Sequence, residues 1–214
     1  YRIMKKHILS IATFLIIVFS IASCKKDSTN TTNNNTNTGG APAITSSYYF
    51  QAKIDGTWVT WQANDISWVS GYGSASGGGT TNYFLIERSD VSDFNETNSG
   101  GIGILKDNVI DINDYPTRYS LFTTGAKPYG KQKTMAANPV EGALVSYTVD
   151  GVEWSSNLGT SDQTGSTFSI TEFIDNTDGA SKKIVGATFS CKLYNGLGGV
   201  KTVTDGKFRG RIID

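Results

Sequence analysis

The sequence has very little histidine and cysteine, the residue types on which much nucleophilic catalysis and zinc binding depend. Its 214 residues include one histidine, His7, and two cysteines, Cys24 and Cys191. His7 and Cys24 both lie within the first 24 residues, so the rest of the chain holds a single thiol and can form no internal disulfide. Without histidine, that part cannot run a Ser-His or Cys-His mechanism or bind a metal through imidazole.

Proline is also scarce, and the chain has no excess of positive charge. The chain has 4 prolines against 24 glycines, and 11% of its residues are aromatic, a composition typical of short strands joined by tight turns. Its 19 basic and 19 acidic residues balance, but residues 1–23 contain three basic residues and no acid. Without that segment the chain has 16 basic and 19 acidic residues, a net charge of −3. This balance argues against binding to nucleic acid, which requires a basic face.

The N-terminal segment has the three parts of a secretory signal. Two lysines form a basic start, residues 8–19 form an apolar run too short to span a bilayer, and small residues follow. Ile21-Ala22-Ser23-Cys24 resembles the lipobox, in which the cysteine thiol is acylated before cleavage. We therefore expect residues 1–23 to be removed and Cys24 to carry acyl chains such as palmitate, which anchor it in a membrane. The alternative is an ordinary secretory cleavage beside an incidental cysteine.

The residues after Cys24 bear on where the protein is displayed. Lys25-Lys26-Asp27 is similar to the start of Bacteroidetes lipoproteins, in which a lysine followed by two or more acids directs surface export. Here one acid follows, so the periplasmic and the surface side of the outer membrane both stay open. Asp27-Ser28-Thr29 resembles the O-glycosylation sequon of that phylum, with Ser28 as the acceptor. Residues 24–46 are predicted to be a flexible linker, because they are mostly Ser, Thr, Asn and Gly.

Residues 47–214 are predicted to form the folded domain, and three Asp-Gly pairs mark its expected turns. Alternating apolar residues run up to Asp55-Gly56 and continue beyond it, which predicts a β-hairpin. The same pattern surrounds Asp150-Gly151. Near the end of the chain, Asp205-Gly206 is predicted to turn the chain in the same way, and Val203, Phe208 and Ile212 are expected on one side.

Further strands are predicted where apolar residues alternate with polar ones. In the clearest of them, Cys191 shares a face with four apolar residues, so it is interpreted as a core thiol and not as a nucleophile. No segment has a helical period of useful length. About ten short strands predict an all-β fold, an antiparallel β-sandwich or a barrel, and leave the choice between the two open. The further strands are expected at 66–72, 82–88, 101–106, 118–123, 167–173 and 183–194.

Three stretches resemble a known group of proteins. They are Phe50-Gln51-Ala52-Lys53-Ile54-Asp55-Gly56-Thr57-Trp58, Ile184-Val185-Gly186-Ala187-Thr188-Phe189 and Val203-Thr204-Asp205-Gly206-Lys207-Phe208. They are similar to small lipoproteins of Bacteroidetes that open with phenylalanine, alanine, Asp-Gly and tryptophan and close with Gly-x-x-Phe and Thr-x-Gly-x-Phe. The resemblance spans most of the domain. Its motifs are turns and core aromatics, so it implies a β-sandwich-like fold and carries over no activity.

Two tryptophans are the candidate ligand-binding residues. By the register of the first hairpin, Trp58 points away from Val59 and Trp61, and Trp68 lies in a predicted strand flanked by serine and glycine. Exposed tryptophans beside Asp or Asn suit stacking on sugar rings, with carboxylates and amides bonding the hydroxyls. Packing in the core is the alternative, since tryptophan is usually mostly buried.

Two other stretches carry charged candidates. Asp90, Asp93 and Glu96 offer oxygen ligands for Ca²⁺, the only cofactor that the sequence suggests. The stretch does not match an EF-hand loop, and Asp and Asn are also ordinary turn residues. The loop 124–142, which includes Lys127 and Lys131, is long enough to be either functional or merely mobile, and its lysines would suit an anionic ligand.

These observations favour a lipid-anchored outer-membrane protein with a non-catalytic β domain that binds a glycan or a partner protein. One alternative is a structural or assembly role, which predicts no ligand. Another is a glycan hydrolase that uses two carboxylates and no histidine. The glutamates available for it sit in no recognisable motif: Glu87, Glu96, Glu141, Glu153 and Glu172.

Overall fold

The computed structural model describes residues 39–63, 68–76, 80–89, 98–107, 115–131, 140–176 and 183–212, all within one compact unit of the chain. For 68–76 and 80–89 it describes the backbone alone. The elements are β1 (Tyr48–Ile54), β2 (Thr57–Ala63), β3 (Trp68–Ser76), β4 (Thr80–Ser89), β5 (Ser99–Asp107), α1 (Tyr115–Leu121), β6 (Gly125–Ala126), β7 (Gly142–Val149), β8 (Val152–Ser155), β9 (Thr167–Asp175), β10 (Lys183–Tyr194) and β11 (Val200–Ile212). The predicted all-β fold is confirmed.

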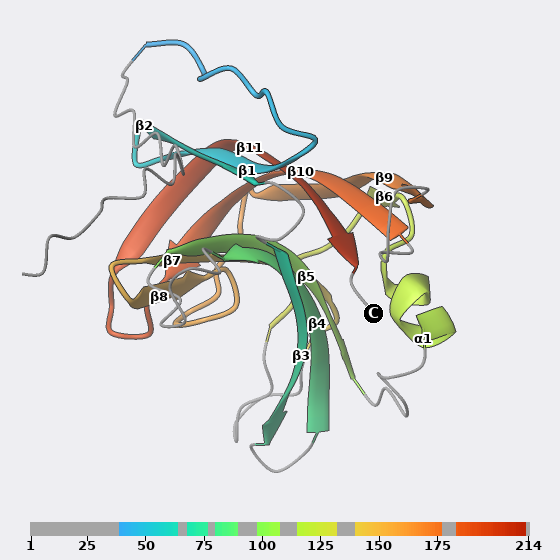
Figure 1. Cartoon of the computed structure of the whole chain (residues 1–214). Helices are drawn as coiled ribbons and strands as arrows, with labels where there is room; N and C mark the ends of the chain where they lie inside the picture. Colours follow the sequence, from blue (N-terminus) through green and yellow to red (C-terminus); the bar gives the residue numbers. More distant parts are fainter. Residues whose placement is uncertain are drawn as a thin grey trace, which may run out of the picture. The chain divides into compact units, whose positions relative to one another are not determined.

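The strands form one antiparallel sheet that folds over into two layers (Figure 1). Its order is β2-β1-β11-β10-β8-β7-β5-β4-β3, with β9 and β6 branching from β10. The branch arises because β10 shares one edge between two partners. Residues 183–190 pair with β9, and Tyr194 pairs with Ser155 of β8. The sheet therefore divides at this edge, as in a sandwich whose layers stay joined at one corner.

Aromatic side chains fill the space between the layers. Phe50 of β1 is fully buried, 5.8 Å from the ring of Phe189 in β10 and 6.5 Å from the ring of Tyr147 in β7. Trp61 stacks on Tyr147 at 5.4 Å. Gly100 of β5 leaves room for this group, because a Cβ there would lie 2.7 Å from the Trp61 ring. The core thus depends on large rings facing a strand that has no side chain at the point of contact.

Two of the three Asp-Gly pairs close hairpins as predicted. Asp55 and Gly56 have φ values of 49° and 84°, and Asp150 and Gly151 have 52° and 74°. Positive φ at both central residues is the type I′ turn, whose twist matches that of the flanking strands. The pairs Ile54↔Thr57 and Val149↔Val152 flank these two-residue loops and set the register of β1–β2 and β7–β8.

The prediction of a third turn at Asp205-Gly206 was wrong. β11 runs through this point, and β10 pairs with it on both sides: Phe189 lies opposite Gly206 and Cys191 opposite Val203. Three steps along β11 therefore match two along β10, which is a β-bulge with Asp205 at a φ of 54°. The extra residue keeps the apolar side chains before and after it on one face. Val203, Phe208 and Ile212 are all buried, as expected.

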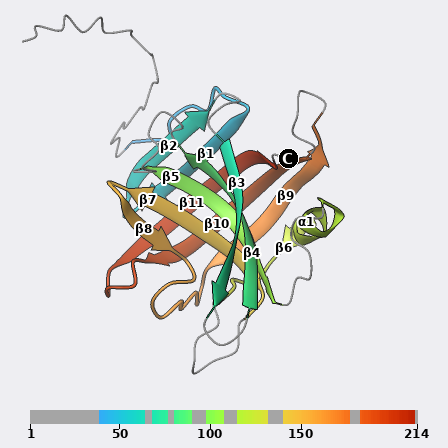
Figure 2. The ribbon, with the colours of Figure 1, turned by 60° about the horizontal axis from the view of Figure 1, so that its bottom comes forward.

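The predicted strand at 118–123, and with it the expectation of no helix, was also wrong. The helix α1 covers Tyr115–Leu121, and Figures 1 and 2 show it beside β6 and β9. Pro116 stands in its first turn, where a fixed φ favours a helix and the missing N–H costs nothing. Leu121 and Phe122 are both buried at its end, a placement that strand alternation does not allow. Within the described ranges, no helix has the length and apolar character needed to cross a membrane.

The segment 39–46, assigned to the linker from its composition, is hydrogen-bonded to the first hairpin. The side chain of Gln51 donates to the carbonyl oxygen of Pro42 at 2.8 Å, and that of Gln62 accepts from the backbone N–H groups of Thr45 and Ser46 at 2.5 and 2.8 Å. The contacts of the folded unit therefore begin before residue 47.

Candidate functional site

The candidate site is a cavity of about 430 Å³ on the outer face of the layer that contains β2, β1, β11, β10 and β9. Its polar residues alternate along the strands with core residues, so they point away from the core. Thr188 stands between the buried Ala187 and Phe189. The cavity is lined by Trp58, Thr167, Thr188, Phe189, Ser190, Asp205, Gly206 and Lys207.

Strand register brings these side chains together from four strands. Thr188 of β10 lies opposite Lys207 of β11, and Ser190 of β10 lies opposite Thr167 of β9. The hydroxyl oxygens of Ser190 and Thr167 are 2.9 Å apart, and the Thr167 N–H donates to the Ser190 hydroxyl at 3.2 Å. These bonds hold two hydroxyls in fixed positions on the wall of the cavity. Trp58 enters from β2.

The bulge in β11 places a carboxylate at the cavity. Asp205 occupies the left-handed region at a φ of 54°, and its side chain is exposed. The hydroxyl of Thr204 donates to Asp205 Oδ2 at 3.1 Å. Bulges re-aim side chains in this way next to many binding sites. Lys207, two residues further along β11, adds an exposed ammonium group. The cavity is therefore lined by one carboxylate and one ammonium group.

Trp58 is held by a bond at its edge while its ring lines the cavity. The indole N–H donates to the carbonyl oxygen of Gly39 at 3.2 Å. Trp58 is partly exposed and is not among the side chains that pack against the core, whereas Trp61 is buried. The predicted separation of the two rings is therefore confirmed. Ligand binding by Trp58 stays a prediction.

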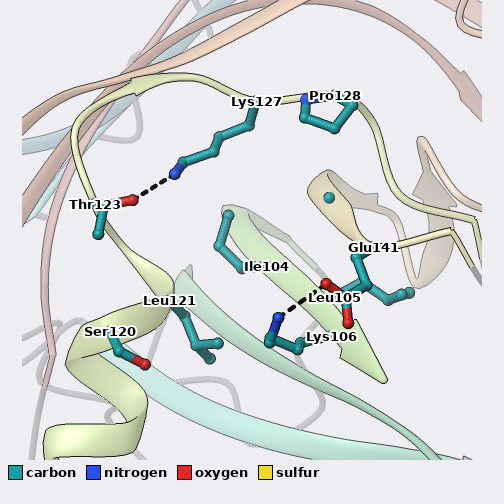
Figure 3. A pocket seen from close by; sticks show the side chains of 10 residues that line it. Ile104, Leu105, Lys106, Ser120, Leu121, Thr123, Lys127, Pro128 and Glu141 are labelled. Atoms are coloured by element: carbon teal, nitrogen blue, oxygen red, sulfur yellow. Dashed lines mark hydrogen bonds and ion pairs between the residues drawn. The ribbon is translucent and has the colours of Figure 1, made fainter. Parts of the chain in front are cut away.

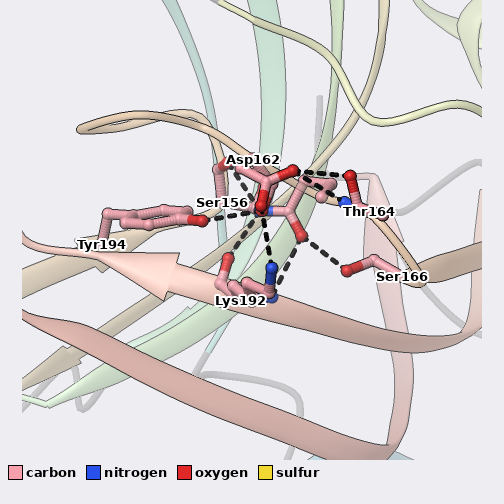
Figure 4. A network of polar contacts seen from close by, with 7 residues as sticks. Ser156, Asp162, Thr164, Ser166, Lys192 and Tyr194 are labelled. Carbon is pink, nitrogen blue, oxygen red and sulfur yellow. Dashed lines mark hydrogen bonds and ion pairs between the residues drawn. The ribbon is translucent and has the colours of Figure 1, made fainter.

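A polar network supports the strand edge beside this cavity (Figure 4). Gln163 Nε2 donates to the Lys192 carbonyl at 2.6 Å, and the Lys192 N–H donates to Gln163 Oε1 at 3.0 Å. The side-chain amide thus pairs with the backbone of β10 as a neighbouring strand would, between the end of β8 at Ser155 and the start of β9 at Thr167. Asp162 forms an ion pair with Lys192 at 2.9 Å, and hydrogen bonds from Lys192 and Thr164 hold the pKa of the Asp162 carboxyl below its usual range.

The single thiol of the domain is part of the core. Cys191 is 3% exposed, and burial raises the pKa of its thiol to about 12. The thiolate is the nucleophilic form, so Cys191 stays protonated and unreactive at neutral pH. Its interpretation as a core residue is confirmed.

Other predicted site residues are not brought to the cavity by anything the structure describes. Trp68 begins β3, at the opposite end of the sheet order from β2, and its side chain lies outside the described part. Cys24, Ser28 and the calcium candidates Asp90, Asp93 and Glu96 also lie outside it. Within the described ranges, no group of three or more His, Cys, Asp or Glu side chains is placed to hold a metal. The calcium site stays a prediction.

Two of the glutamates considered for hydrolysis form ion pairs, while Glu153 is exposed on β8 and does not line the cavity beside Trp58. Glu141 pairs with Lys106 at 2.9 Å, and Glu172 pairs with Arg209 at 2.7 Å. Neither lines the cavity beside Trp58.

Five of the residues that surround the cavity were not predicted as site residues from the sequence. Their outward positions in β9, β10 and β11 follow from strand alternation, but that alternation does not reveal which strands lie near Trp58. The five are Thr167, Thr188, Ser190, Asp205 and Lys207. No protein-family model, curated protein or solved structure matches the chain.

Proposed function

We propose that the domain binds a carbohydrate in the cavity beside Trp58, without catalysis. The observation that carries the proposal is the meeting of a partly exposed indole with a carboxylate, an ammonium group and three hydroxyls on one outer sheet face. An indole ring stacks on the apolar face of a sugar ring, and the surrounding polar groups bond its hydroxyls. The volume falls in the range of about 300–1,000 Å³ typical of small-ligand sites.

Each polar group has a role that suits a sugar. Asp205 accepts hydrogen bonds from adjacent hydroxyls, and Lys207 donates to hydroxyl oxygens. Thr188, Ser190 and Thr167 each donate or accept, as sugar hydroxyls do. All five stand on strands and not on loops, which favours a pre-formed site with little ordering cost on binding.

We also propose that Cys24 anchors this domain to the outer membrane through acyl chains. A binding face on a lipid-anchored domain would hold polysaccharide at the envelope. Labelling cells with radioactive palmitate tests the anchor. We expect label in the full chain and none in Cys24→Ser, which leaves the membrane fraction. Equal membrane retention of both forms contradicts the anchor and leaves the binding site untouched.

The binding proposal is tested on the full chain purified in mild detergent. Thermal melting and tryptophan fluorescence are measured with four soluble probes, namely xylan, laminarin, yeast mannan and dextran. A ligand that binds only the native state raises its melting temperature. We expect a shift with at least one probe, and we expect Trp58→Ala and Asp205→Asn to remove it.

Trp154→Ala is the matched control, because Trp154 occupies the second Asp-Gly hairpin. Trp154 packs against the core and lies under the Lys201 ammonium at 4.6 Å. We expect Trp154→Ala to lower the melting temperature of the free protein and to keep the response to the probe. We expect Trp58→Ala to leave that melting temperature nearly unchanged and to lose the response. A response that survives Trp58→Ala, or none with any probe, overturns carbohydrate binding and favours a structural role.

A further inference from the structure

A second cavity of about 410 Å³ lies where α1 and the segment after it meet β5 and the start of β7 (Figure 3). It shares no lining residue with the cavity beside Trp58. Its apolar wall includes Ile104 and Leu121, which are both 6% exposed and belong to the core. The cavity therefore reaches the edge of the hydrophobic core.

Charged groups stand on opposite sides of this apolar wall. On one side, Lys106 Nζ pairs with Glu141 Oε2 at 2.9 Å, and both side chains are about half exposed. On the other side, Lys127 Nζ donates to the Thr123 hydroxyl at 2.5 Å. Among the residues that the structure describes, no carboxylate lies within ion-pair distance of Lys127. Figure 3 shows Ile104 between Lys127 and the Lys106–Glu141 pair, so the cavity has one cation that no described acid neutralises.

The segment that carries Lys127 is fixed by the sheet. The Lys127 N–H donates to the Phe168 carbonyl at 3.0 Å, and the Ala143 N–H donates to the Pro128 carbonyl at 2.7 Å. Tyr129 is buried, with its hydroxyl 3.0 Å from the Ser190 carbonyl oxygen. These contacts fix the backbone at Lys127, and the Thr123 hydroxyl holds its ammonium group in the cavity before any ligand arrives, which lowers the ordering cost of binding.

We propose that this cavity binds a small amphiphilic carboxylate. The acyl part lies over Ile104 and Leu121, and the carboxylate accepts from the Lys127 ammonium. A ligand that buries apolar surface and also pairs with a cation satisfies both features of the site. Lys106 and Glu141 neutralise each other, so the single positive charge of Lys127 matches a monoanion better than a phosphate dianion.

Octanoate is the probe, titrated calorimetrically into the full chain, with octylamine and inorganic phosphate as comparisons. We expect binding of octanoate alone. Replacing Lys127 by glutamine removes a charge-assisted hydrogen bond, so we expect affinity to fall roughly tenfold or more. Glu141→Gln frees Lys106 from its partner and removes a repelling charge, so it should tighten binding.

Lys131→Gln is the matched control, because Lys131 is an exposed lysine four residues along the chain that does not line the cavity. It should leave the affinity unchanged, and Lys127→Arg should retain binding. Melting curves without ligand establish that each variant is folded. The proposal is overturned if octylamine or phosphate binds as well as octanoate, if Lys131→Gln weakens binding as much as Lys127→Gln, or if Glu141→Gln weakens it. Trp58→Ala should leave octanoate binding intact, so this proposal stands or falls independently of carbohydrate binding.

Discussion

Asp55-Gly56 and Asp150-Gly151 reverse the chain at the ends of hairpins, whereas Asp205-Gly206 lies in the middle of β11. The three aspartates have nearly the same φ, with values of 49°, 52° and 54°. The glycines differ, since Gly56 and Gly151 have positive φ and Gly206 does not. The φ of the aspartate is therefore common to turn and bulge, and the φ of the glycine after it distinguishes them.

The surroundings of the glycines explain this difference. A Cβ on Gly56 or Gly151 would meet nothing within 4 Å, because both turns project into solvent. A Cβ on Gly206 would lie 2.3 Å from the ring of Phe189 on β10. β10 continues past the bulge and pairs with β11 on both sides of it. Long-range pairing thus holds β11 extended where the local sequence alone would turn.

The largest expected effect comes from Gly206→Ala. The added methyl group overlaps the buried Phe189 ring, and overpacking of this kind costs about 3 kcal/mol of unfolding free energy. Urea denaturation of the full chain measures the loss. Phe189→Leu combined with Gly206→Ala should recover part of it, because the two sites are in contact and their effects are not additive. If Gly206→Ala lost no more unfolding free energy than Gly151→Ala, the glycine of the bulge would not be more tightly packed than the glycine of the turn.

Removing the side chain of Asp55 should have the next largest effect. Its carboxylate accepts from the Thr202 N–H at 2.8 Å and lies 3.4 Å from Lys201 Nζ, so it ties the first turn to β11. Asp55→Ala should cost about 2 kcal/mol, roughly half from left-handed backbone strain and half from the lost hydrogen bond. Asp55→Asn keeps an acceptor oxygen and tolerates positive φ, so we expect it to lose less. Equal losses in the two variants would show that the carboxylate tie is not what stabilises this turn.

The sequence predicts the structure correctly where the deciding contacts are local. The hairpin β1–β2 and the bounds of β10 were predicted, because alternation and a two-residue turn lie within one short stretch. The bulge was missed because β10 imposes it. The helix α1 was missed because Leu121 and Phe122, adjacent in sequence, are both buried. At the candidate site, Trp58 was found from hairpin register, while Asp205 reaches the same cavity only through the order β2-β1-β11.

An intermediate effect is expected for Gly151→Ala. Its φ of 74° strains any side chain, yet the new methyl group has open space around it. We therefore expect a loss of about 1 kcal/mol in urea denaturation, with no steric contribution. Gly56→Ala should match it, since its φ is 84° and its surroundings are equally open. A difference between these two turns as large as the loss itself would indicate a contact of one turn that the comparison neglects.

The smallest effect concerns charge at the turns. Tyr147 has its pKa raised above the usual 10.0, first by burial and then by the carboxylates of Asp150 and Asp55. Because the raised value belongs to the folded state, Tyr147 stabilises the fold fully below pH 10, and that contribution is lost as the pH rises from 10 through the folded-state value. Asp150→Asn should lower the pKa of Tyr147 slightly while changing stability at pH 7 by less than about 0.5 kcal/mol.

Absorbance titration of tyrosine measures this shift, with Tyr147→Phe identifying the relevant step among the 10 tyrosines of the chain. Asp205→Asn is the control, because Asp205 is not among the groups that raise the pKa of Tyr147. If Asp205→Asn shifted the pKa of Tyr147 as far as Asp150→Asn does, the carboxylates of the hairpin turns would not differ from the carboxylate of the bulge in their effect on Tyr147. A shift confined to Asp150→Asn and Asp55→Asn would show that the two hairpin turns act on one side chain of the core, while the carboxylate at the bulge serves the outer face.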